Sequence, residues 1–187
     1  MQTERLSLEP VTVRNAPALW QILQAPDLRR FQDLPNVGVG TFTAMVGKRP
    51  KRLDPRAVGR FEWLVLLKED GTAVGWVSLR ITEREPAIGE IGYSLLSEFR
   101  GRGIAAEAVR ELIGEAFEKA RLRAVRAYCV PENSESRRLL ERIGFEPDGV
   151  LPHGASVSGA PVDVLAHAIP RARWNQSGKT IETPASA

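Results

Sequence analysis

The stretch Arg100-Gly101-Arg102-Gly103-Ile104-Ala105 places two glycines directly before a long segment with an apolar stripe. Glycine leaves backbone N–H groups uncovered, so a bulky anion can approach the main chain. The following segment is predicted to be a helix, because its apolar residues recur at helical spacing. A helix begins with unsatisfied N–H groups at its positive dipole end, so the stretch predicts a phosphate site. The stripe consists of Ile104, Ala105, Ala108, Val109, Leu112, Ile113, Ala116, Phe117 and Ala120.

The spacing excludes two common phosphate loops. The Walker pattern ends in Gly-Lys-Ser/Thr, and no such ending is present. The dinucleotide fingerprint needs a third glycine, where Ala106 or Glu107 stands instead, depending on the register. What remains is an Arg/Gln-x-x-Gly-x-Gly/Ala pattern filled by Arg100, Gly103 and Ala105. It resembles the pyrophosphate loop of the GNAT superfamily, which comprises acyl-coenzyme A-dependent N-acetyltransferases.

A second motif distinguishes this resemblance from a simple glycine-rich turn before a helix. The stretch Asn133-Ser134-Glu135-Ser136-Arg137-Arg138-Leu139-Leu140-Glu141-Arg142-Ile143-Gly144-Phe145 resembles the superfamily's Asn-x-x-Ser-x-x-Leu-Leu-x-x-x-Gly-Phe element. Asn133 is expected to cap a helix that Gly144 ends in a left-handed conformation. The resemblance runs from about Thr3 to about Ile169 and is closest to the RimJ/RimL-like branch, which includes ribosomal-protein-alanine acetyltransferases.

The resemblance implies an α/β (α+β) fold, the GNAT fold. Its central mixed, mostly antiparallel sheet has six to seven strands and about four helices, and strands 4 and 5 splay apart at the cofactor site. The order of elements read from the sequence, an antiparallel meander followed by a βαβα unit, fits this fold. Strands are expected at 6–11, 61–67, 74–81, 87–96, 124–130, 149–152 and 162–169. Helices are expected at 16–31, with Asn15 as cap and a break at Pro26, at 41–46, after Gly103 and after Asn133.

Composition indicates one ordinary globular domain. The chain has 187 residues, 43% hydrophobic and 26% charged, with a formal net charge of +3. We expect a single domain over 1–174 and a disordered polar tail over 175–187. The only cysteine, Cys129, excludes an internal disulfide and, with no signal peptide or membrane span in sight, favours the cytoplasm. Neither a metal site nor nucleic-acid binding is expected.

The resemblance implies acetyl-CoA as cosubstrate, without a metal. Backbone N–H groups would wrap the pyrophosphate, and the main chain of the splayed strand would pair with the pantetheine arm and supply an oxyanion donor. The amide of Asn133 would lie against the pantetheine or the sulfur. The side chains of Arg100 and Arg102 either add charge or remain solvated. The implied cofactor residues are Tyr93, Leu95, Leu96, Arg100, Gly101, Arg102, Gly103, Ile104, Ala105, Ala106 and Asn133.

Two residues are candidates for proton transfer. Many superfamily members use a tyrosine in the helix after the fifth strand, and this helix has none. Ser136 is the candidate donor to the thiolate, and the alternative is a serine that only caps the helix. Glu90, on the strand before the phosphate loop, is the candidate base acting through water, unless an ordered water suffices. Cys129 is interpreted as a packed core residue rather than a nucleophile.

The acceptor is expected to be a protein or peptide N-terminus. A small amine, such as an amino acid or an antibiotic, is the alternative within enzymes, and an acyl-CoA-binding module without turnover is the alternative outside them. A basic segment before the second strand argues against a polyamine and favours an anionic acceptor, unless it is merely solvated or binds the coenzyme's 3′-phosphate. Because relatives often pair, a homodimer is compatible with the resemblance. The segment contains Arg29, Arg30, Lys48, Arg49, Lys51, Arg52, Arg56 and Arg60.

Overall fold

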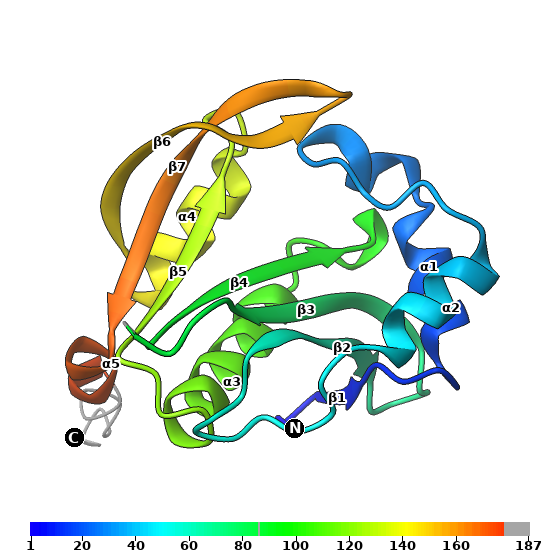
Figure 1. Cartoon of the computed structure of the whole chain (residues 1–187), viewed down its shortest axis with the longest axis horizontal. Helices are drawn as coiled ribbons and strands as arrows, with labels where there is room; N and C mark the ends of the chain where they lie inside the picture. The colour runs from blue at the N-terminus through cyan, green and yellow to red at the C-terminus, as the bar shows by residue number, and fades with distance from the viewer. Residues whose placement is uncertain (86, 178–187) are drawn as a thin grey trace, which may run out of the picture.

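The computed structural model describes residues 1–85 and 87–177 as a seven-stranded sheet with helices packed on both faces (Figure 1). The strand order is β1-β2-β3-β4-β5-β7-β6. The strands are β1 (Leu6–Pro10), β2 (Gly59–Leu67), β3 (Ala73–Ile81), β4 (Ile88–Leu95), β5 (Ala124–Cys129), β6 (Glu146–Val157) and β7 (Ala160–Pro170). The helices are α1 (Ala16–Leu23), α2 (Val39–Gly47), α3 (Ile104–Glu118), α4 (Ser134–Ile143) and α5 (Arg171–Ser177), with two 3-10 helices, η1 (Pro26–Arg30) and η2 (Ser97–Phe99).

The expected meander and βαβα unit are confirmed. Strands β1 to β4 are antiparallel neighbours in chain order, and α3 then carries the chain across so that β5 lies parallel to β4. The sheet is completed by the antiparallel pairs β5–β7 and β7–β6. The described part of the chain holds five α-helices, slightly more than expected, and no helix there is long and apolar enough to cross a membrane.

The two central strands separate as the resemblance implied. Pairing between β4 and β5 runs only from Ile88 opposite Ala124 to Ile91 opposite Ala127. Beyond Ile91, β4 keeps its antiparallel partner β3 but leaves β5, and Figure 1 shows the two strands diverging. The free edge of β4 therefore faces a gap in the middle of the sheet.

Helices cover the two faces of the sheet with separate apolar clusters. The predicted stripe of α3 is buried, and Leu112 and Ile113 pack in one cluster with sheet residues such as Leu79. On the other face, α1 and α2 bury Leu64 and Trp76 in a second cluster. Because side chains alternate along a strand, successive residues of β4 belong to opposite faces. The gap is therefore accessible from two chemically different sides.

The predicted helix 16–31 breaks at Pro26 as expected, but its second half is a 3-10 helix rather than an α-helix. Its α-helical part ends at Leu23, and the chain continues as η1 after Ala25 adopts an extended ψ of 123°. Proline disfavours the helical conformation of the residue before it, so the break falls at Ala25. Asn15 is not a side-chain cap of α1. Its amide instead accepts from the N–H of Thr12 at 2.7 Å and donates to the carbonyl of Pro10 at 3.1 Å.

The last two strands are much longer than the alternation of apolar residues indicated. β6 is almost entirely exposed, so its side chains carry little hydrophobic pattern, and two register shifts interrupt its pairing with β7. Pattern reading detects half-buried strands and misses solvent-facing ones. Residues 175–177 of the predicted tail belong to α5, and 178–187 lie outside the described residues.

The tip of the β6–β7 hairpin is bound to the segment after η1, and we call this contact the Asp33 bridge. The Asp33 carboxylate accepts from the Ser156 hydroxyl at 2.5 Å and from the N–H groups of Ser158 and Gly159 at 2.8 and 3.0 Å. The Asp33 N–H donates in turn to the Ser156 carbonyl at 3.0 Å. Figure 1 shows this contact joining the hairpin to the N-terminal segment.

Candidate active site

A cavity of about 790 Å³ opens at the gap between β4 and β5. Its walls come from the start of α3, the start of α4, η1 and the β6–β7 hairpin. Most of the predicted site residues line it, although Leu96 and Arg102 do not. Those that do are Glu90, Tyr93, Leu95, Arg100, Gly101, Gly103, Ile104, Ala105, Ala106, Asn133 and Ser136.

The loop before α3 presents its main chain to this cavity. Gly101 and Gly103 have φ angles of 72° and 77°, which side chains disfavour, and an added Cβ at Gly101 would meet no atom within 4 Å. The backbone N–H groups of residues 101–106 make no hydrogen bond with any described residue. Several free donors at the start of a 15-residue helix suit a diphosphate, so the residues present fit the pyrophosphate of coenzyme A.

The side chains of the two arginines in the loop already contact other residues, which limits their availability for phosphate. The Arg100 guanidinium donates twice to the Leu95 carbonyl, at 3.1 and 2.9 Å, and pairs with Asp27 at 2.5 Å. It therefore ties the end of β4 to η1. Arg102 lies over the Phe99 ring, 5.7 Å from its centroid. The main chain is consequently the better candidate for anion binding than either side chain.

The free edge of β4 offers few main-chain groups to a pantetheine arm. The Leu96 N–H already donates to the Val74 carbonyl at 3.0 Å, and the Leu95 carbonyl is occupied by Arg100. In an antiparallel pair, alternate residues direct their N–H and C=O to opposite edges, so Tyr93 and Leu95 direct theirs toward the gap. The free groups on this edge are therefore both main-chain groups of Tyr93 and the N–H of Leu95.

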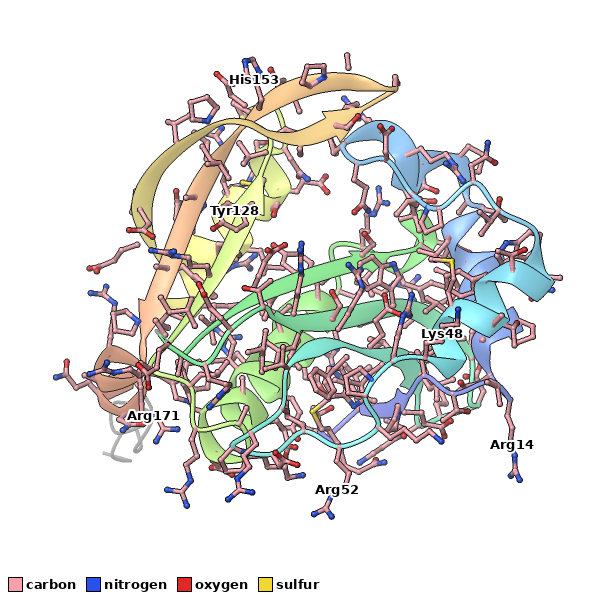
Figure 2. The ribbon with its side chains drawn as sticks, in the orientation of Figure 1. Arg14, Lys48, Arg52, Tyr128, His153 and Arg171 are labelled. Carbon is pink, nitrogen blue, oxygen red and sulfur yellow. The ribbon has the colours of Figure 1, made fainter. Side chains whose placement is uncertain are left out.

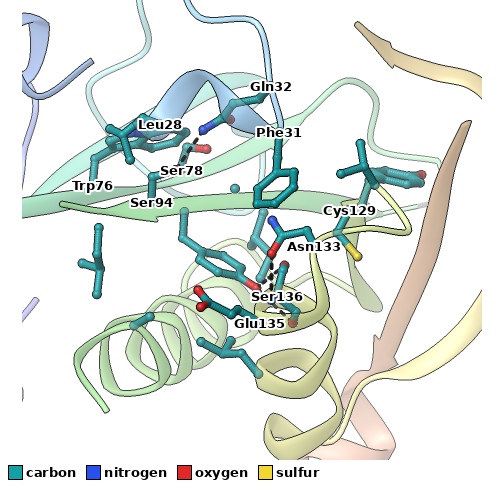
Figure 3. Close-up of a pocket in the computed structure, with 18 of the residues that line it drawn as sticks. Leu28, Phe31, Gln32, Trp76, Ser78, Ser94, Cys129, Asn133, Glu135 and Ser136 are labelled. Carbon is teal, nitrogen blue, oxygen red and sulfur yellow. Dashed lines mark hydrogen bonds between the residues drawn. The ribbon is translucent and has the colours of Figure 1, made fainter. Parts of the chain in front are cut away.

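A hydroxyl pair joins β4 to α4 on the α3 side of the gap. The Tyr93 hydroxyl and the Ser136 Oγ share a hydrogen bond of 2.8 Å. Ser136 does not cap its helix, because the N-cap is Asn133, whose Oδ1 accepts from the Ser136 N–H at 3.1 Å. Figure 3 shows Asn133 and Ser136 together at the start of α4, facing Phe31. The Ser136 side chain therefore contacts a tyrosine and does not cap the helix.

Burial controls the protonation of the Tyr93 hydroxyl and of the Cys129 thiol. It raises the pKa of the Tyr93 hydroxyl well above its ordinary value, a change that the hydrogen bond to Ser136 only partly offsets. Burial likewise raises the pKa of the nearby Cys129 thiol, which is 6% exposed. Tyr93 therefore stays neutral and able to donate a proton, while Cys129 stays a thiol and lacks the character of a nucleophile.

A different set of side chains occupies the opposite side of β4. Glu90 is exposed into the cavity and makes no hydrogen bond or ion pair with the described residues. Gln32 donates to the Ser94 hydroxyl at 2.9 Å. Figure 3 shows Gln32 and Ser78 on the side of β4 away from Ser136. Alternation along the strand therefore places Glu90 and Ser94 on the face opposite Tyr93.

The basic segment does not gather at the cavity as the sequence suggested. Arg49 forms an ion pair with the buried Glu62, Arg29 donates to the Leu34 carbonyl, and Arg52 points outward (Figure 2). After α2 the chain returns toward the start of β2, so only Arg60, which lies on that strand, lines the cavity. The prediction that Lys48 to Arg52 attract the acceptor loses its structural basis.

Sequence reasoning missed three contributors to the site. The Tyr93 side chain was assigned no role, Phe31 was placed at the end of a helix rather than in the cavity wall, and Gln32 was assigned to no element. Tyr93 was detectable, because a polar aromatic at an inward position of a strand needs a buried partner. Phe31 and Gln32 reach the site only through tertiary packing. Within residues 1–85 and 87–177, no group of three or more His, Cys, Asp and Glu could hold a metal ion.

Comparisons with known proteins identify the family to which this chain belongs. Residues 5–146 match the family described as "Acetyltransferase (GNAT) domain". The "Uncharacterized N-acetyltransferase p20" of Bacillus licheniformis is 28% identical over 165 residues, 88% of this chain and 92% of that protein.

Two solved structures share the fold. One is RimL, a ribosomal α-N-protein acetyltransferase in complex with coenzyme A, with a TM-score of 0.78 and 21% identity over 90% of this chain and 95% of that one. The other is the ribosomal-protein-S5-alanine acetyltransferase of Vibrio fischeri, with a TM-score of 0.78 and 22% identity over 93% and 97%. With this match to the family and with its splayed central strands, the chain belongs to the GNAT acetyltransferases and is an N-acetyltransferase.

Proposed function

We propose that the protein transfers an acetyl group from acetyl-CoA to the free amine of a protein or peptide N-terminus, by direct attack in a ternary complex. One observation carries the proposal. The Tyr93–Ser136 pair and the Glu90 carboxylate lie on opposite sides of the same strand edge and open into one cavity. Two substrates that approach from the two sides would meet at the gap. An acyl-cysteine route is disfavoured, because Cys129 is buried and its pKa is raised.

Each chemical requirement of the transfer has a group suited to it. Glu90 accepts a proton from the attacking amine through a water molecule, and the Tyr93 N–H donates to the carbonyl oxygen as the N–C bond forms. As the C–S bond breaks, the Ser136 hydroxyl gives its proton to the sulfur, and Tyr93 replaces that proton. Glu90 releases its proton to solvent, and the hydroxyl pair regains one from solvent. The protein is thereby returned to its starting state.

The choice of an N-terminal acceptor is supported by the fold neighbours. RimL and the Vibrio fischeri enzyme both act on ribosomal proteins according to their names, and they share more than nine-tenths of their length with this chain. The spermidine/spermine N-acetyltransferase SpeG of Vibrio cholerae shares the fold equally well, with a TM-score of 0.78 at 16% identity. The fold therefore accommodates both kinds of acceptor, and a direct comparison of them is needed.

An acceptor panel tests the proposal. The protein is incubated with acetyl-CoA and a lysine-containing peptide, the same peptide with its N-terminus blocked, free amino acids, or spermidine. Release of the coenzyme thiol and the mass of the product are followed. We expect turnover with the free N-terminus and none with the blocked peptide. Equal turnover of the blocked peptide, or turnover of small amines alone, would refute an N-terminal acceptor.

A further inference from the structure

We propose that the acceptor carries a carboxylate within a few bonds of its reacting amine, and that Arg80, supported by Arg60, recognises it. The inference rests on the proposed function and names the chemical class of its substrate. It concerns a part of the cavity that the transfer chemistry leaves unused.

Four charged residues form a row across the acceptor face of the sheet. In the register of the strands, Arg60 on β2 lies opposite Arg80 on β3, Arg80 opposite Glu90 on β4, and Glu90 opposite Arg126 on β5. Directly opposed residues of neighbouring strands point to the same face. Arg60, Arg80 and Glu90 line the cavity. The row therefore places Arg60 and Arg80 in the same cavity wall as Glu90, the carboxylate proposed to receive the amine proton.

The other arginines of this neighbourhood have ion-pair partners, and the side chain of Arg80 has none. Arg126 pairs with Asp148 at 3.0 Å. Arg60 donates to Glu62 at 2.8 Å, and Arg49 forms a second ion pair with the same carboxylate. Within residues 1–85 and 87–177, the side chain of Arg80 makes no hydrogen bond or ion pair, although its backbone pairs with β2 and β4. An unpaired guanidinium in a cavity wall has five donors available for an anionic ligand.

The electrostatics of the row favour an anion at this position. The single carboxylate of Glu62 is shared by two arginines, so it does not neutralise both. Burial lowers the pKa of Arg60, the charge of Glu90 opposes this, and the charge of Arg80 lowers it by a smaller amount. A carboxylate bound between Arg60 and Arg80 would relieve this repulsion. Arginine suits the role, because its planar fork matches a carboxylate through two parallel hydrogen bonds.

The spacing limits the acceptor to a narrow class. Directly opposed residues of an antiparallel pair have Cβ atoms about 5 Å apart, so the groups bound by Glu90 and Arg80 must be close neighbours in the substrate. An aspartate or glutamate at the first or second position of a peptide satisfies this. Any free amino acid satisfies it as well, because its α-carboxylate and its amine are bonded to the same carbon. A polyamine does not, because it would bring positive charge to Arg80.

Matched peptides test the inference. Peptides that begin with Asp or Asn, or carry Glu or Gln at the second position, are compared as acceptors of the complete protein. We expect kcat/KM to favour the acidic member by about tenfold, a typical effect of one charge-assisted hydrogen bond. Arg80→Gln should remove this preference and leave KM for acetyl-CoA unchanged. Arg80→Glu should reverse it in favour of a lysine peptide, a gain that unfolding could not produce. Arg52→Gln, on the outer surface, is the matched control and should change none of these values.

The outcomes separate this inference from the function on which it rests. Equal turnover of acidic and amide peptides by the unmodified protein would overturn the carboxylate inference and leave the N-terminal acceptor intact. Turnover of free amino acids over the same amino acids with amidated α-carboxyl groups, with no turnover of any peptide, would support the carboxylate inference and overturn the N-terminal acceptor. A preference that survives in Arg80→Gln would show that another residue recognises the carboxylate.

Discussion

The proposed cofactor side and the proposed acceptor side of the gap are built in different ways. On the cofactor side, the donors of residues 101–106 are consecutive in the chain, and Asn133 and Ser136 are one helical turn apart. On the acceptor side, the wall combines η1, β2, β3, β4 and the distant β6–β7 hairpin. A short contiguous motif can serve every member of a family that uses the same coenzyme. A wall assembled from separate segments can change one segment at a time, so specificity belongs to the acceptor side.

The strongest test of this difference is a change in the phosphate loop. Gly103→Val should weaken coenzyme A binding by roughly 10³-fold, because backbone strain of ~1–3 kcal/mol at positive φ adds to lost hydrogen bonds of ~1.5–3 kcal/mol to a charged group. Isothermal calorimetry measures the loss. Gly114→Ala, in the middle of α3 with no atom near the added Cβ, is the control and should bind normally. Normal binding by Gly103→Val would remove the loop from the site.

The second test concerns the hydroxyl pair that serves the coenzyme sulfur. Ser136→Ala should lower kcat by about 10²-fold, at the low end of the range for a positioned proton donor. Thermal stability should change little, because Asn133 caps the helix through the backbone N–H of residue 136. Ser134→Ala, in the same turn, is the control.

A double-mutant cycle then asks whether the two hydroxyls act together. If Tyr93 returns a proton to Ser136 after each transfer, Tyr93→Phe and the double variant with Ser136→Ala should have nearly the same kcat as Ser136→Ala alone. Independent, multiplying losses would contradict a shared proton path and leave Ser136 as a donor on its own.

On the acceptor side, Glu90→Gln should have a smaller effect. We expect turnover to fall by about tenfold, because the carboxylate acts through water rather than by direct contact. The loss should be greatest at low pH, where few acceptor amines are already deprotonated, and coenzyme affinity should stay constant. A pH–rate profile with both substrates saturating measures this. A loss that is the same at every pH would indicate that Glu90 orients the acceptor rather than accepting its proton.

The smallest effect is expected at the rim of the acceptor side. Asp33→Asn replaces a carboxylate that accepts three hydrogen bonds, so the N–H groups of Ser158 and Gly159 should exchange faster in hydrogen-exchange measurements. These hydrogen bonds hold the pKa of Asp33 below its ordinary value of 3.8, and the bond from Ser156 has the largest effect. Their contribution is therefore complete above pH 4 and is lost only as pH falls through the lower folded value. Protection that changes between pH 5 and 8 would contradict this account.

The same contrast explains what the sequence could predict. Gly103 and Asn133 sit in motifs whose spacing reflects local backbone geometry, so the loop and the helices after them were predictable from the residues, whereas the splayed strands were predictable only from the resemblance to the family. The opposite faces of Glu90 and Tyr93 follow from strand alternation, which is also local. The neighbours of Arg80 were not predictable, since they depend on the register of four strands. The length of β6 was missed because its exposed side chains carry no apolar alternation.

The Asp33 bridge has a consequence for how a substrate can enter. It joins two segments more than 120 residues apart in the chain, next to Gln32 and Ala155 of the cavity wall. The rim of the cavity on that side is therefore held by four hydrogen bonds between two distant segments. A bridged rim leaves less room than an open one, so we expect it to admit a flexible chain end, as in the proposed N-terminal acceptor, more readily than a lysine in the middle of a folded surface.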